Sequence, residues 1–118
     1  YFSDHQLFET LYSRLSEDVD TLAERAVGLG VDANVDLHKR LSGMQRFIGE
    51  MYAPSGVPTP DAIVERSLAA EYALGRIIMM AITSMRALGS LTPGVESMLE
   101  QLHDGRERAI YHLRRRTA

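Results

Sequence analysis

Residues 3–27 read SDHQLFETLYSRLSEDVDTLAERAV, and their apolar side chains recur at steps of three and four residues. That spacing places them along one face of an α-helix. The members of this stripe are Phe8, Leu11, Tyr12, Leu15, Val19, Leu22 and Ala26. Ser3 or Asp4 can cap the amino end of the helix, and Gly28 and Gly30 end it. The stretch therefore predicts one long amphipathic helix.

A second helix is predicted over residues 35–51, with Asn34 or Asp36 as its cap. Its apolar stripe consists of Leu37, Leu41, Met44, Phe47, Ile48 and Met51. Residues 53–58 combine proline, serine and glycine, so they predict a loop.

Two further helices are predicted, and each opens with a threonine–proline pair. Thr59 caps a helix that runs to about Leu88 and stops at Gly89. Thr92 caps the last helix, which runs to about Arg115. Long helices joined by short connections are typical of an antiparallel bundle. We therefore expect an all-α fold in a single domain.

The composition limits the chemistry of such a bundle. The chain has 16 Asp and Glu against 13 Lys and Arg, a formal net charge of −3, which does not suggest a nucleic-acid binder. Cysteine is absent, so a metal would be held by histidine and carboxylates, which suit iron, manganese or zinc. No apolar run reaches the roughly 20 residues of a membrane span. No signal peptide is recognisable, and we expect a cytoplasmic protein.

Four side chains that can bind a metal share one face of the first predicted helix. At 100° per residue, with His5 at 0°, Glu9 lies at about 40°, Asp20 at about 60° and Glu24 at about 100°. His5 and Glu9 are four residues apart, as are Asp20 and Glu24, so the members of each pair are neighbours. The two pairs are separated by roughly 22 Å along the helix. Because metal–ligand bonds are about 2 Å long, the pairs cannot share one ion within a chain.

A second copy of this helix can bring the pairs together. If two copies cross antiparallel at a two-fold axis near Arg14 and Leu15, the first pair of one chain faces the second pair of the other. Such an interface is self-complementary, so it creates two identical sites. Each site has one imidazole and three carboxylates, a ligand set suited to iron. The same spacing also fits two separate weak sites or a solvated acidic surface.

Residues 20–30, DTLAERAVGLG, resemble the second helix of Dps-type miniferritins, a family of the ferritin-like superfamily. That family has a histidine, a carboxylate four residues later, and then an Asp-x-x-x-Glu pair. The spacing of His5, Glu9, Asp20 and Glu24 is similar, with Glu9 standing where Asp is usual. The sequence around His5 also fits, and the last predicted helix resembles the family more loosely.

The resemblance implies a ferritin-like antiparallel four-helix bundle. Residues 35–51 would be an extra helix between the second and third bundle helices. The first bundle helix, which carries a further histidine ligand, would lie upstream of this chain in a domain truncated at its amino end. Alternatively, residues 35–51 would replace that helix and the site would lack the ligand.

The resemblance also implies that the chain is a ferroxidase. The residues His5, Glu9, Asp20 and Glu24 would be iron ligands between two-fold-related subunits of a hollow homo-oligomer, usually a dodecamer. Proteins of this family bind Fe(II), oxidise it with hydrogen peroxide or oxygen, and store a ferric mineral. Iron storage of this kind protects against oxidative stress.

Other residues admit alternative interpretations. Glu100 and His103 form one Glu-x-x-His step of an intrachain di-iron bundle, which Glu71 could join. Because that site needs two such motifs, we favour a surface glutamate and a half-buried histidine. Residues 114–116 are three arginines, which either contact phosphate weakly or compensate the helix dipole. The competing function is a non-enzymatic helical interaction or DNA-binding module without metal.

The methionines and the other acidic residues have simple explanations. Met79, Met80 and Met85 lie in the most apolar predicted helix, so we expect them to fill the core. Glu96, Glu100 and Asp104 form an acidic stripe that lines an iron entry pore or faces water.

Overall fold

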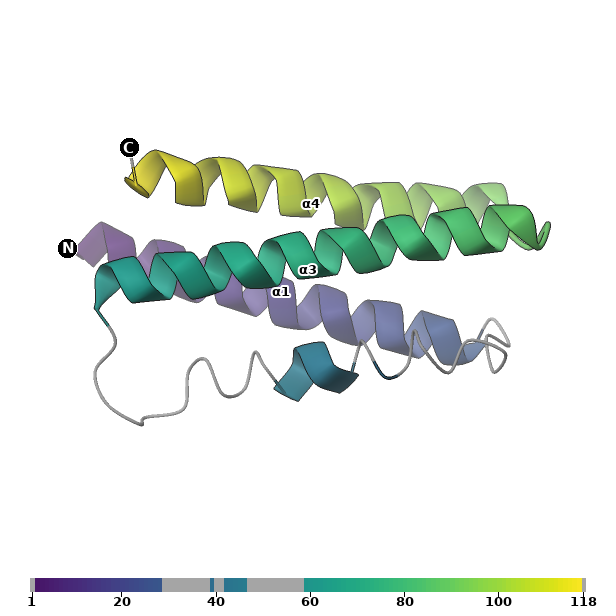
Figure 1. Cartoon of the computed structure of the whole chain (residues 1–118), viewed down its shortest axis with the longest axis horizontal. Coiled ribbons are helices and arrows are strands. Elements are labelled where there is room, and N and C mark those ends of the chain that lie inside the picture. Colours follow the sequence, from purple (N-terminus) through teal and green to yellow (C-terminus); the bar gives the residue numbers. More distant parts are fainter. Residues whose placement is uncertain (1, 29–38, 40–41, 47–58, 118) are drawn as a thin grey trace. The chain divides into compact units, whose positions relative to one another are not determined.

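The computed structural model describes residues 2–28, 39, 42–46 and 59–117 (Figure 1). These residues form α1 (Phe2–Gly28), α3 (Pro60–Ala87) and α4 (Pro93–Thr117), and residues 42–46 are also helical. The predicted all-α class is confirmed for the described part of the chain. The predictions for residues 34–38, 40–41 and 47–58 lie outside the described residues.

The chain divides into two compact units, Tyr1–Thr59 and Pro60–Ala118, each described by itself. In the first unit, α1 is one unbroken helix that buries most of the predicted stripe, with Tyr12 half-buried. Its buried side chains are Phe8, Leu11, Leu15, Val19 and Leu22. In residues 42–46, Met44 is buried, and the neighbouring Gln45 donates a hydrogen bond from Nε2 to Oδ1 of Asp20 over 2.9 Å. This bond connects that segment to α1.

In the second unit, α3 and α4 pack side by side as an antiparallel hairpin (Figure 1). The core of the hairpin includes Leu74, Ile78, Leu99 and Leu113, which are almost completely buried. Arg86 pairs with Glu96 at 3.2 Å near the turn. Farther from the turn, the Arg114 guanidinium lies 5.6 Å from the centre of the Tyr72 ring. Contacts of two arginines thus supplement the hydrophobic interface between α3 and α4.

The turn between α3 and α4 follows from local sequence signals. Gly89 has φ +69°, a conformation that side chains with a Cβ rarely adopt. The Ser90 amide donates to the Met85 carbonyl over 2.9 Å, which satisfies one of the last carbonyls of α3. The hydroxyl of Thr92 accepts a hydrogen bond from the Val95 amide over 3.3 Å. The predicted glycine stop and threonine cap are therefore confirmed.

We expect Gly89→Ala to lower the free energy of unfolding by about 1–2 kcal/mol, because an L side chain is strained at this positive φ. A Cβ at Gly89 would meet no atom within 4 Å, so strain is the only expected cost. Gly94, in the first turn of α4, has equally open surroundings without a positive φ. Gly94→Ala is therefore a control that should not destabilise. Urea unfolding followed by circular dichroism measures both, and equal stability of Gly89→Ala and wild type would contradict the strain.

The prediction that all three methionines of α3 fill the core is wrong for two of them. Met85 is buried, but the exposed fractions of Met79 and Met80 are 48% and 43%. Ile77 and Ile78 are buried and define the inward side of α3. Because each residue turns the helix by 100°, the next two positions leave that side.

The helix α3 is also long and apolar enough, by length and composition alone, to cross a membrane. The sequence analysis expected no segment that could span a membrane, and the length and composition of α3 do not agree with that expectation. A core helix of a soluble protein passes the same test. α3 carries a row of buried side chains in this structure.

Candidate functional site

The predicted metal ligands all lie on α1, which runs without interruption from Phe2 to Gly28. The side chains of Glu9, Asp20 and Glu24 are exposed, whereas the side chain of His5 lies outside the described part. The centre of this face is about 130° from the centre of the buried stripe of α1. The three described carboxylates therefore point away from the buried side and are accessible to an ion or a second protein.

Within one chain, α1 places the two predicted pairs on one face but not in one site. An unbroken helix fixes their separation at roughly 22 Å. Among the described side chains, no group of three or more histidine, aspartate or glutamate residues lies close enough to hold a metal ion. A shared site would therefore require a second helix.

The carboxylate of Asp20 is held by a residue that the sequence did not single out. Gln45 donates to one of its oxygens over 2.9 Å. A carboxylate has two oxygens with about four lone-pair positions, so this bond leaves most of its capacity for an ion. The contact joins residues 25 positions apart and depends on tertiary packing. No local pattern in the sequence could have revealed it.

A second polar group lies buried inside the hairpin. Arg106 of α4 places Nε 2.6 Å from Oε2 of Glu71 on α3, and both side chains are 2% exposed. Opposite charges at this depth stabilise each other, because neither is tolerated alone away from water. Glu71, which could have joined a di-iron site, is therefore engaged with an arginine. The sequence analysis did not identify Arg106.

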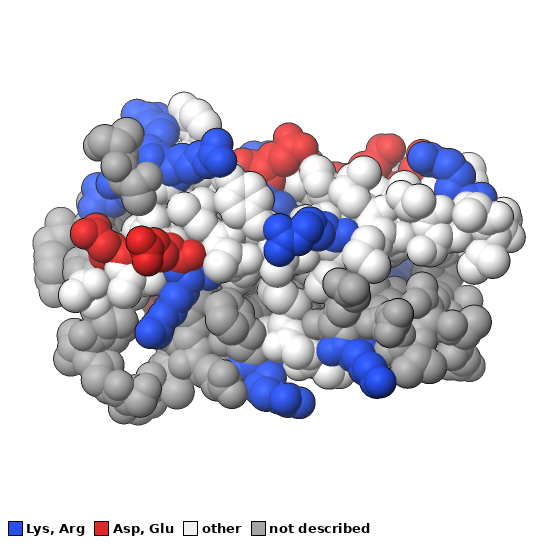
Figure 2. Space-filling model, in the orientation of Figure 1, with Lys and Arg blue, Asp and Glu red and all other residues white. Residues whose placement is uncertain are grey.

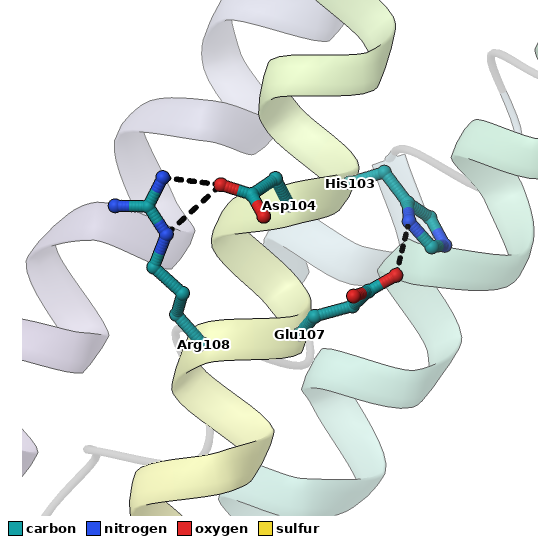
Figure 3. Close-up of polar contacts among 4 residues, drawn as sticks. All are labelled: His103, Asp104, Glu107 and Arg108. Atoms are coloured by element: carbon teal, nitrogen blue, oxygen red, sulfur yellow. Dashed lines mark hydrogen bonds and ion pairs between the residues drawn. The ribbon is translucent and has the colours of Figure 1, made fainter.

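The histidine of the candidate Glu-x-x-His step pairs with Glu107 (Figure 3). The Nδ1 atom of His103 lies 3.2 Å from Oε1 of Glu107, one helical turn further along α4. The ring is half-buried and Glu100 is exposed, as the simpler interpretation predicted. Asp104 is paired with Arg108 in the same view. Part of the acidic stripe is thus neutralised by neighbouring arginines.

The basic end of the chain gathers over the last turn of α4 (Figure 2). Arg114 contacts the Tyr72 ring, and the Arg115 guanidinium lies 5.7 Å from the centre of the Tyr111 ring. These cation–π contacts give two of the three arginines a role within the hairpin. The cluster alone therefore adds little support for DNA binding.

No family model matches the chain, and no curated protein or solved structure matches it. The likeness to Dps-type miniferritins therefore rests on the spacing of the residues quoted from the sequence.

Proposed function

We propose that this chain is a subunit of a Dps-type, ferritin-like assembly that oxidises Fe(II) and stores ferric iron. The observation that supports this most is the arrangement on α1. His5, Glu9, Asp20 and Glu24 lie in two i,i+4 pairs on one unbroken helix, and the three described carboxylates are exposed. The ferroxidase site in this proposal is shared by two subunits related by a two-fold axis.

A single two-fold axis can bring the two ligand pairs together from different subunits. In an antiparallel pair of α1 helices, His5 stands opposite Glu24 and Glu9 opposite Asp20 when the axis passes between residues 14 and 15. Ser13 and Ser16 flank this point on the ligand-bearing face. Small side chains at a crossing allow two helices to approach closely, because the distance between helix axes depends on the side chains there.

The proposed ligand set suits a change in iron oxidation state. Carboxylates are hard oxygen ligands that hold both ferrous and ferric iron, and a neutral imidazole adds a nitrogen ligand. Two Fe(II) ions each give one electron to hydrogen peroxide, which takes up two protons and becomes two water molecules. Consuming peroxide together with iron would limit the formation of hydroxyl radicals.

Assembly and activity are tested together on the full-length protein. Light scattering after gel filtration should give a particle of about twelve chains, and Fe(II) with peroxide should produce a growing ferric absorbance. A monomer or dimer with no iron-dependent signal would exclude the proposal. That outcome would favour the non-enzymatic helical interaction module.

We expect Gln45→Ala to weaken Fe(II) binding by about 10- to 100-fold, the usual effect of removing a hydrogen bond that orients a metal ligand. The reason is that the Asp20 carboxylate loses the donor that fixes its orientation. Anaerobic titration calorimetry measures the affinity, and gel filtration checks that assembly persists. Ser42→Ala, an exposed change in the same segment, is the control. Unchanged affinity in Gln45→Ala would show that this bond does not orient a ligand.

A further inference from the structure

A groove of about 510 Å³ runs along the hairpin between α3 and α4. Its apolar lining comes from Tyr72, Gly75, Met79 and Met80 on α3 and from Ile110 on α4. Small-molecule sites occupy about 300–1,000 Å³ and are mostly apolar with a few polar groups. The proposed iron chemistry uses none of these residues, so the groove is a separate feature.

Gly75 leaves the floor of the groove open. Glycine is unfavourable in a helix interior relative to alanine, and Gly75 lies in the middle of α3. A Cβ at this position would meet no atom within 4 Å. No close contact in the described part of the chain therefore requires a glycine there. Glycine is common where a ligand must approach the backbone closely.

The methionines beside the glycine favour an aromatic occupant. Met79 and Met80 are 48% and 43% exposed on the same groove. The thioether of methionine is polarizable and makes favourable contacts with the edges of aromatic rings. A flat ring lying over Gly75 would contact both thioethers and cover apolar surface that now faces water.

One cation that lines the groove, Arg76, is exposed and can contact an occupant. Glu71 is paired with Arg106 at 2.6 Å, and Glu107 lies 3.2 Å from His103. Arg76 lines the groove, is exposed, and makes no ion pair in the described part of the chain. A guanidinium can bind an acidic group through two hydrogen bonds and can stack on an aromatic ring. An acidic group on an occupant can therefore contact Arg76 at this part of the groove.

We propose that this groove binds a planar aromatic anion. The ring system lies over Gly75 between the methionines and Ile110, and the acidic group contacts Arg76. This inference does not depend on the proposed iron chemistry, because it involves neither α1 nor its carboxylates.

Two fluorescent probes test the acidic group. 8-Anilinonaphthalene-1-sulfonate is an aromatic anion with a flat naphthalene ring, and N-phenyl-1-naphthylamine has the same rings without the charge. Arg76→Gln should weaken binding of the anion about three- to fivefold, as expected for one exposed ion pair, and leave the neutral probe unchanged. Arg66→Gln, an exposed arginine of α3 outside the groove, is the matched control. An equal effect of both variants on the anion would overturn the assignment of Arg76.

A larger side chain at Gly75 tests whether the probes bind in this groove. Gly75→Leu should weaken both probes by about tenfold or more, because the leucine side chain occupies their place. Ala69→Leu places the same side chain at an exposed position of α3 outside the groove and should bind both probes normally. Circular dichroism confirms that each variant keeps its helices. Normal binding by Gly75→Leu would overturn the proposal.

Two further results would also overturn it. Binding of many probe molecules per chain, rising as urea loosens the fold, would indicate exposed core rather than a site. Loss of the probe as the chain self-associates would show that a second copy covers the groove. One saturable probe per chain at all protein concentrations is the expected result.

Discussion

The double substitution Asp20→Asn and Glu24→Gln should slow Fe(II) oxidation by more than about 100-fold, because removal of ligands exceeds the effect of removing an orienting hydrogen bond. The amides keep the shape of the side chains but not the charge that offsets a ferric ion. Both residues are exposed on α1, so the fold should be preserved. Stopped-flow absorbance with Fe(II) and peroxide measures the rate. Wild-type oxidation by this variant would rule out these residues as ligands.

A control separates this effect from a general loss of negative charge. Asp61 and Glu65 are exposed on the other unit, and their change to asparagine and glutamine removes the same charge. We expect that variant to oxidise iron normally. A comparable loss of rate in the control would mean that long-range attraction of iron, rather than ligation, was being measured.

Mixing two inactive variants distinguishes a shared site from an intrachain one. One variant has the first pair replaced by alanine, His5 and Glu9, and the other has Asp20→Asn with Glu24→Gln. In a two-fold dimer of unlike chains, one site contains both damaged pairs and the other both intact pairs. Random pairing should therefore restore about one quarter of the sites after unfolding and refolding the mixture. An intrachain site would give no recovery.

Much of the fold could be predicted because its signals are local. Thr92 as a cap and Gly89 as a stop each act within one turn of the backbone, and the structure confirms both. The buried side of α3 could not be predicted in the same way. Its middle is apolar on more than one face, so the sequence alone did not show that Met79 and Met80 would be exposed. The packing of α4 against one side of α3 contributes to that distinction.

The candidate site was predicted in part for the same reason. Helical periodicity places the carboxylates of α1 on one face, and those that the structure describes are exposed. The pairs Asp20–Gln45 and Glu71–Arg106 join distant positions, so no local pattern specified them. Whether the two halves of the iron site meet depends on a second chain and stays a prediction.

The buried ion pair should have the largest effect on stability. Replacing Arg106 with alanine should lower the free energy of unfolding by about 3–5 kcal/mol, because the Glu71 carboxylate stays buried without its arginine. Urea unfolding measures the change. Arg108→Ala removes the exposed pair with Asp104 one turn away and should cost less than about 1 kcal/mol. Similar losses in the two variants would contradict the role of burial.

Replacing both Glu71 and Arg106 separates the net contribution of the ion pair to the free energy of unfolding from the cost of leaving one charge buried alone. Leucine at Glu71 with methionine at Arg106 leaves no buried charge and similar side-chain volume. This double variant should recover most of the stability lost by Arg106→Ala, and substitutions of this kind have raised stability by about 1–4 kcal/mol. A buried pair that stabilises the fold itself predicts the opposite, a double variant as unstable as the single one. Recovery would show that the pair adds no net stability beyond that of an apolar replacement of similar volume.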